Sequence, residues 1–162
     1  LSSMYMSYDI LPDLNFKISG GATNNFNINN GYIPTFNLVT NIPGQVSIGS
    51  RRTVNYNRYL GEALLNYKKT FGSHSIAALA GYSAENSRTT SQYNRNKGFA
   101  NDDLKTFNFT QSASVLNSEY TASEWMLTSL FGRVNYDYQK KYMVFASIRR
   151  DGSSRFGWDN LY

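Results

Sequence analysis

His74 is the only histidine of the chain, so its residue type makes it the first candidate for acid–base chemistry. It lies in an expected turn beside Gly72 and Ser73. A catalytic triad requires an acid and a nucleophile close to the imidazole, and no spacing in the sequence supplies them. The chain has no cysteine, which excludes a disulfide framework and a cysteine-based zinc site. We therefore expect no enzyme activity and no catalytic or metal role for His74.

Asp102 and Asp103 are adjacent carboxylates, which makes them candidates for a calcium site. Calcium takes about six to eight oxygen ligands, and no third carboxylate follows these two at a ligand spacing. A solvated loop or the start of a short helix explains the pair as well. We expect no metal and no cofactor.

The run from Arg149 to Arg155 (Arg-Arg-Asp-Gly-Ser-Ser-Arg) is the densest group of charges. Strand alternation places Arg149 and Asp151 on one face and Arg150 on the other. The sequence predicts an ion-pair network that fixes strand register, with an electrostatic contact from Arg149 to a ligand or a neighbouring domain as the alternative. The members of this network are Arg133, Asp137, Arg149 and Asp151.

Two Asn-rich stretches combine aromatic rings with amide and guanidinium groups, the side chains that sugar-binding sites use. The candidates for contact with a substrate or partner are Tyr32 and Phe36 in the first stretch and Tyr93, Arg95 and Phe107 in the second. Two alternatives remain open. Asn tolerates turn geometry and is common in loops for that reason, and the aromatic rings would equally anchor the loops or contact a lid protein.

The elements that must position these residues are strands, because period-2 alternation dominates the sequence. In the segment 142–151, Tyr142, Val144, Ala146 and Ile148 share one face, opposite Met143, Phe145, Ser147, Arg149 and Asp151. The segment before it alternates in the same way, and only Gln139-Lys140-Lys141 separates the two, so they predict a tight hairpin.

The same unit occurs twice more, which gives an all-β antiparallel meander of about six long strands. The hairpins are expected at about 1–25, 53–92 and 121–156, with long polar loops at about 26–52 and 93–120. Short turns alternating with long loops are typical of outer-membrane barrels, whose periplasmic turns are short and whose extracellular loops are long. Six Tyr near expected strand ends suit an interfacial aromatic girdle, although Tyr is also a good strand former. They are Tyr8, Tyr59, Tyr67, Tyr136, Tyr138 and Tyr142.

The composition excludes several other classes of protein. A net charge of +5 accompanies basic residues scattered in ones and twos, so no nucleic-acid partner is expected. The 15 % aromatic content argues against disorder. The longest apolar run, 76–80, is far short of a membrane-spanning helix, and the N-terminal residues show no signal peptide.

A membrane sheet has to close, because each unpaired backbone group in lipid costs several kcal/mol. Single-chain barrels begin at about 8 strands, so six strands predict a section of a larger barrel. In such a wall Arg149 and Asp151 face the lumen. Arg150 faces outward near the outer rim, within reach of lipopolysaccharide phosphates.

The C-terminal stretch resembles the barrel of SusC/RagA-type TonB-dependent transporters of Bacteroidetes. The resemblance rests on Phe131-Gly132-Arg133-Val134-Asn135-Tyr136-Asp137-Tyr138 and on the segment 146–157, Ala-Ser-Ile-Arg-Arg-Asp-Gly-Ser-Ser-Arg-Phe-Gly. Weaker likenesses lie at 8–14, 61–67 and 79–83. The resemblance implies a 22-stranded barrel in a Gram-negative outer membrane, a plug domain, a SusD-like surface lipoprotein as a lid, and energy from TonB. The sequence shows neither the plug nor a TonB box.

The function that follows is import of oligosaccharides or oligopeptides through the outer membrane, in contact with membrane lipid and lipopolysaccharide. Two alternatives stay open. A passive porin or adhesin-type barrel shares every periodicity argument. A soluble secreted carbohydrate-binding β-domain would need a compact core and would fold without detergent.

Overall fold

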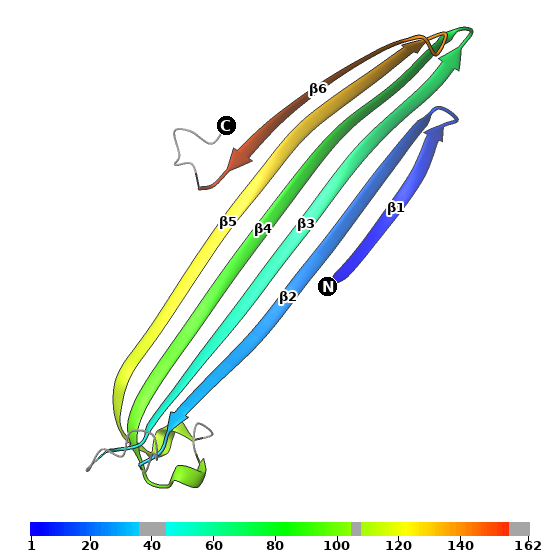
Figure 1. Ribbon diagram of the computed structural model, residues 1–162. Coiled ribbons are helices and arrows are strands. Elements are labelled where there is room, and N and C mark those ends of the chain that lie inside the picture. The colour runs from blue at the N-terminus through cyan, green and yellow to red at the C-terminus, as the bar shows by residue number, and fades with distance from the viewer. Residues whose placement is uncertain (36–44, 105–107, 156–162) are drawn as a thin grey trace. The chain divides into compact units, whose positions relative to one another are not determined.

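A computed structural model describes residues 1–35, 45–104 and 108–155. Six strands follow one another: β1 (Ser2–Leu11), β2 (Leu14–Ile33), β3 (Ile48–Phe71), β4 (His74–Phe99), β5 (Ser112–Tyr138) and β6 (Tyr142–Ser153). They form one six-stranded sheet in the order β1-β2-β3-β4-β5-β6 (Figure 1). Two 3-10 helices, η1 (Asp102–Leu104) and η2 (Phe109–Gln111), lie between β4 and β5. The predicted all-β meander is confirmed.

Three tight turns join the strands in pairs. Pro12-Asp13 connects β1 to β2, and Gly72-Ser73 connects β3 to β4, with Gly72 at φ 59°. Between β5 and β6, Gln139 and Lys140 both have positive φ, 54° and 56°, and the Lys141 amide donates to the Tyr138 carbonyl over 3.0 Å. This is a type I′ turn, which matches the twist of a hairpin. The three predicted hairpin turns therefore lie where the alternation placed them.

The expected loops at 26–52 and 93–120 were wrong in extent. Strand β2 continues to Ile33 and β3 begins at Ile48, so the first connection covers only 34–47. Strand β4 continues to Phe99 and β5 begins at Ser112, which shortens the second connection to 100–111. The added segments are rich in Asn and Ser, a composition typical of loops. In β2 the alternation does continue, because Phe26, Ile28 and Tyr32 alternate with Asn27, Asn29 and Gly31.

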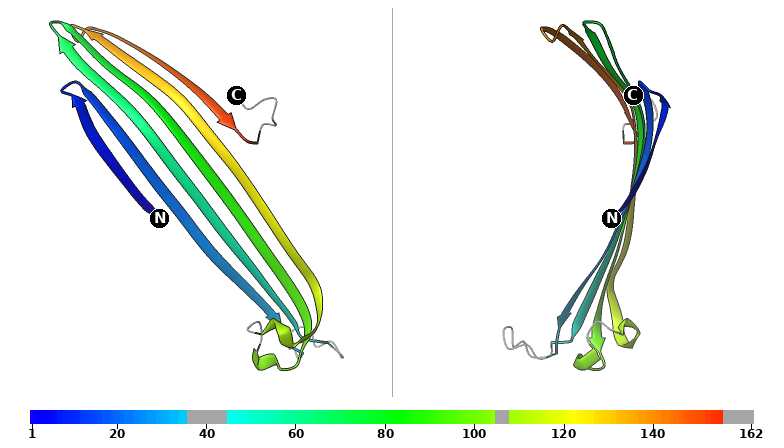
Figure 2. Two further views of the ribbon diagram at one scale, coloured as in Figure 1. Left: turned by 180° about the vertical axis from the view of Figure 1, so that it is seen from behind. Right: turned by 90° about the vertical axis from the view of Figure 1, so that its right-hand side faces the viewer.

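The chain divides into two compact units. Unit 1 comprises Leu1–Thr23, Asn57–Ser87 and Glu124–Tyr162, and unit 2 comprises Asn24–Tyr56 and Arg88–Ser123. In unit 1 the strands form a single layer, and no described helix covers either side of it (Figure 2). Phe99 is the only buried hydrophobic side chain among the described residues, with 6 % of its surface exposed. Unit 1 therefore stabilises itself without a water-excluding core.

Unit 1 has an apolar face and a polar face. Strand register pairs Met6 with Ile18, Val134 with Ala146 and Tyr136 with Val144, all on the apolar face. The large side chains on this face of β1, β5 and β6 are Met4, Met6, Tyr8, Leu130, Val134, Tyr136, Tyr138, Tyr142, Val144 and Ile148. Many of them are widely exposed, Ile148 to 77 %. An exposed apolar surface of this extent marks a face that contacts a membrane or another protein.

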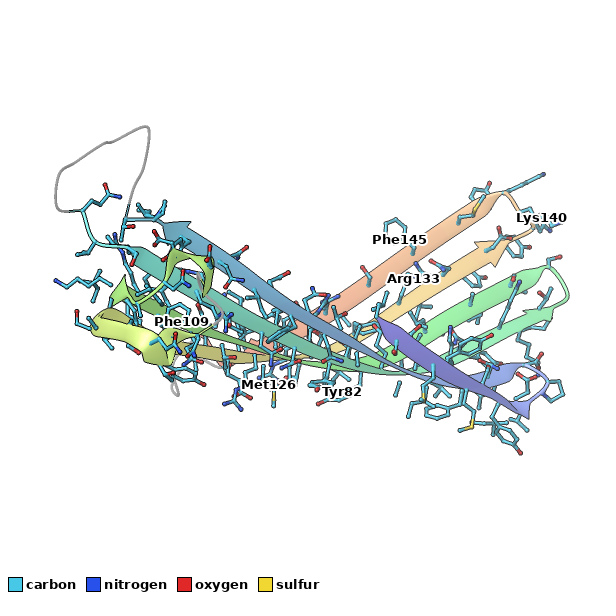
Figure 3. All side chains as sticks on the ribbon, turned by 90° about the horizontal axis from the view of Figure 1, so that it is seen from below. Tyr82, Phe109, Met126, Arg133, Lys140 and Phe145 are labelled. Atoms are coloured by element: carbon cyan, nitrogen blue, oxygen red, sulfur yellow. The ribbon has the colours of Figure 1, made fainter. Side chains whose placement is uncertain are left out.

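The polar face of unit 1 carries the alternate residues. Register pairs Ser7 with Lys17, Arg133 with Ser147 and Ser129 with Asp151. Figure 3 shows Arg133 and Phe145 on one side of the sheet and Tyr82 and Met126 on the other. The alternation predicted for β5 and β6 is therefore realised as two distinct faces, and the polar face also carries the exposed side chains of Met143 and Phe145 in β6.

Unit 2 contains a small cluster that fixes the connections between strands. The Ser47 side chain is fully buried, and its Oγ accepts from the Phe99 amide over 2.8 Å. The Phe99 ring contacts Tyr32 and Phe109 edge-on, with centroids 5.6 and 5.8 Å from its own.

No helix of the described chain is long and apolar enough to cross a membrane.

Candidate functional site

Arg149 and Asp151 are brought together on the polar face of unit 1. Arg149 Nε donates to Asp151 Oδ1 over 2.8 Å and to Oδ2 over 3.0 Å. A guanidinium nitrogen, Nη2, donates to Ser129 Oγ over 3.1 Å, and the guanidinium carbon lies 5.8 Å from the centroid of the Phe131 ring. These contacts tie β6 to the facing residues of β5. The register-fixing role of this pair stays a prediction.

Arg133 and Asp137 do not join that pair. Among the described residues, neither side chain takes part in an ion pair. Arg133 lies opposite Ser147, and Asp137 Oδ1 accepts from the Lys140 amide over 2.8 Å, within the type I′ turn. The polar face of unit 1 does hold another ion pair, in which Arg58 Nη2 donates to Glu85 Oε2 over 2.9 Å.

Arg150 lies on the apolar face, opposite Leu130. Tyr82, Thr128 and Leu130 line a hollow beside it. The alternation predicted that Arg150 lies on the face opposite to Arg149 and Asp151. The suggested contact with lipopolysaccharide phosphates stays a prediction.

His74 belongs to an aromatic group beside the tight turns. Its Nδ1 lies 2.6 Å from the Tyr136 hydroxyl, and its ring centroid is 4.9 Å from that of Tyr138 and 5.6 Å from that of Phe71. The described residues contain no group of three or more His, Cys, Asp or Glu side chains able to hold a metal. The geometry around His74 is that of a packed, hydrogen-bonded ring.

Tyr32 and Asp102 meet in unit 2 although 70 residues separate them. The Tyr32 hydroxyl donates to Asp102 Oδ1 over 2.7 Å, and the Thr35 hydroxyl and amide donate to Oδ2 over 2.5 and 3.2 Å. The hydrogen bonds from Thr35 and Tyr32 hold the pKa of Asp102 below its usual range. Asp102 thus links the connection after β2 to the connection after β4, a role the sequence did not indicate.

Tyr93 and Arg95 lie on one side of β4 in unit 2, two residues apart. The Arg52 guanidinium covers the Tyr93 ring at 5.0 Å from its centroid, which places Arg52 on the same side. Alternation adds Lys97 to this group. Phe36 and Phe107, the other two candidates, lie outside the described residues.

Arg52 and Lys97 were not among the predicted contact residues, because both were assigned to loops. A longer strand would have revealed them, because residues 93, 95 and 97 alternate to one face and Arg52 follows the same alternation in β3 as Arg58. The arrangement is suited to binding polar and anionic groups, since it offers fixed cations and one aromatic ring and contains no nucleophile or general base.

Similarities in sequence and in structure relate the chain to known proteins. TonB-dependent receptor P39 of Formosa agariphila is 35 % identical over 98 % of the chain, and TonB-dependent receptor P3 of the same bacterium is 31 % identical over 99 % of it. The chain spans only 15 % and 16 % of the lengths of these two relatives. No protein-family model matches.

Solved structures agree in fold. The RagAB peptide transporter superposes with a TM-score of 0.89 over 98 % of this chain and 18 % of that one, at 21 % identity. The same importer in its "open-open" state gives a TM-score of 0.88. The six-stranded sheet is therefore the fold of a barrel wall, with the two-faced chemistry that a wall requires. By sequence and by fold, the chain belongs to the SusC/RagA-type TonB-dependent transporters and corresponds to a section of their outer-membrane barrel.

Proposed function

We propose that unit 1 is the part of the barrel wall that crosses the outer membrane, with its apolar face toward lipid and its polar face toward the lumen. The observation that carries the proposal is the opposite chemistry of these two faces. On the apolar face of β5, side chains from Met126 to Tyr136 cover about 33 Å of strand at about 3.3 Å per residue. At the usual tilt of about 40° this length spans about 25 Å, the height of the apolar band in such barrels.

The open edges of the sheet support a larger barrel. Strands β1 and β6 each pair with one neighbour only. Unpaired backbone groups in lipid cost several kcal/mol each, so further strands must pair with β1 and with β6. Unit 2 contains the remaining parts of β2 to β5, with the connections 34–47 and 100–111.

The function of the whole protein is active import of a nutrient too large for a porin, with energy from TonB and a SusD-like lipoprotein as lid. The similarity to TonB-dependent receptors supports this proposal, and an oligosaccharide is the substrate that the Asn-rich and aromatic side chains of unit 2 favour. The chain's own part is to form the wall and to contact the substrate, without bond chemistry.

Single-cysteine variants test the placement of unit 1, because the chain has no cysteine of its own. Val134→Cys and Asn135→Cys form a matched pair on the two faces of β5. In the full receptor, in isolated outer membranes, a charged maleimide is expected to label position 135 and to leave position 134 unlabelled. Equal labelling of both positions by the charged reagent would contradict a lipid-facing Val134.

Transport is tested separately in cells that carry the full receptor. Uptake of a fluorescent oligosaccharide should stop when the receptor gene is deleted and also when an ionophore dissipates the proton gradient. Uptake that needs the receptor and continues with the ionophore present would indicate a passive porin and overturn the TonB-coupled mechanism.

A further inference from the structure

Three cations share one side of the strands in unit 2. Arg52 in β3 covers Tyr93 in β4, and Arg95 and Lys97 follow Tyr93 at alternate positions. Consecutive alternate residues lie roughly 7 Å apart along a strand. All three basic side chains belong to exposed residues. They form a cationic stripe, a name used below for Arg52, Arg95 and Lys97.

The cationic stripe forms no ion pair within residues 1–35, 45–104 and 108–155. Two carboxylates of unit 2 bind neutral groups instead. Asp102 accepts from Tyr32 and Thr35, and Glu119 Oε1 accepts from the Asn117 amide over 2.7 Å. Like charges held along one strand repel each other, so the stripe gains from an anionic partner.

The neighbouring strand adds neutral hydrogen-bonding groups. Arg51 Nε donates to Asn30 Oδ1 over 3.0 Å, which places Asn30 on the side opposite to the cationic stripe. Alternation along β2 then places Asn25, Asn27 and Asn29 on the same side as the stripe, and all three are exposed. Each amide both donates and accepts hydrogen bonds, as sugar hydroxyls do.

We propose that the cationic stripe, together with Asn25, Asn27 and Asn29, binds an acidic oligosaccharide, one that bears carboxylate or sulfate groups. This inference rests on the proposed import function and names the substrate class of the same site. The guanidinium and ammonium groups pair with the anionic groups, and the three Asn side chains bind the hydroxyls. A mixed-sequence oligopeptide fits less well, because it does not carry an anionic group on every unit to pair with the three cations.

Binding to the full receptor in detergent, measured by calorimetry at low ionic strength, tests the inference. The probes are an oligouronate, a sulfated oligosaccharide, a neutral oligosaccharide of equal length and an acidic peptide. The test variant is Arg95→Gln/Lys97→Gln, since within the described part of the chain neither side chain forms an ion pair or a hydrogen bond whose loss would disturb folding. The control is Lys140→Gln/Lys141→Gln, which removes the same charge at the turn between β5 and β6.

An acidic probe should bind the wild type and the control equally and the test variant about tenfold more weakly, because each exposed ion pair contributes roughly threefold. Comparing the oligouronate with the sulfated probe shows which anionic group is preferred. The inference would be overturned if neutral and acidic sugars bound equally tightly. It would also be overturned if the acidic peptide bound more tightly than both acidic sugars. Either result would leave the proposed import function intact. Failure of every probe to bind or enter cells would instead overturn the proposed function.

Discussion

Gly81 lies under the Phe131 ring on the polar face of unit 1. A Cβ at this position would overlap the Phe131 ring and would come within 2.8 Å of Leu64 Cδ2. The missing side chain is therefore what lets Phe131 lie across β4, and the Phe131 ring in turn supports the Arg149 guanidinium. One glycine thus positions the ion pair between Arg149 and Asp151.

Gly81→Ala is expected to destabilise the folded barrel by about 1–3 kcal/mol, because added atoms in a close contact force neighbouring side chains off their rotamers. The measurement is urea unfolding of the full receptor in lipid vesicles, followed by tryptophan fluorescence. Gly61→Ala is the matched control, since nothing lies within 4 Å of a Cβ at Gly61. In the Gly81→Ala variant, a second change, Phe131→Leu, should restore most of the lost stability. Equal destabilisation by Gly81→Ala and Gly61→Ala would show that Phe131 does not crowd Gly81.

At the scale of elements, a single carboxylate joins two connections between strands. Asp102 in η1 accepts hydrogen bonds from Tyr32, near the end of β2, and from Thr35, just after it. Because these bonds lower the pKa of Asp102, they favour its ionised form. Their contribution to stability is complete above the ordinary pKa of an aspartate and is lost as the pH falls through the lowered value.

Hydrogen exchange at the Thr35 amide measures this link. Protection in the wild type should fall as the pH drops below about 4, after correction for the intrinsic exchange rate. Asp102→Asn should lose about tenfold of the protection at neutral pH, because a charge-assisted bond is about twice as strong as a neutral one. Asp103→Asn, the neighbouring control, should leave protection unchanged. A pH response that persists in Asp102→Asn would locate the titrating group elsewhere.

In the whole barrel, the free-energy cost of introducing a charge depends on the face of the sheet on which the residue lies. Val134 and Asn135 are neighbours in β5 that belong to opposite faces and pair with Ala146 and Phe145. Val134→Arg should destabilise the barrel by about 2–4 kcal/mol, because an arginine facing lipid near the midplane costs that much. Asn135→Arg, facing the lumen, should cost far less. Folded yield in lipid vesicles over a urea series would show the difference, and equal costs would refute the assignment of faces.

The strand pattern in the sequence was sufficient for the fold class and for much of the polar face. Alternation predicted the hairpin turns, the two faces of β5 and β6, and the position of Arg149 on the same face as Asp151. It could do so because successive side chains of a strand point to opposite faces of the sheet. It was overridden where the composition is rich in Asn and Ser. The segments 26–33 and 112–120 were assigned to loops for that reason, although they belong to β2 and β5.

Tertiary structure decided which distant residues meet. The bonds from Tyr32 to Asp102 and from His74 to Tyr136, and the stacking of Arg52 on Tyr93, join residues 70, 62 and 41 positions apart. No local period encodes such contacts, because they depend on how strands are ordered and aligned across the sheet. The sequence by itself therefore determined a two-faced wall of strands. The pairing of those strands determined the link at Asp102 and the cationic stripe, since strand register decides which side chains become neighbours.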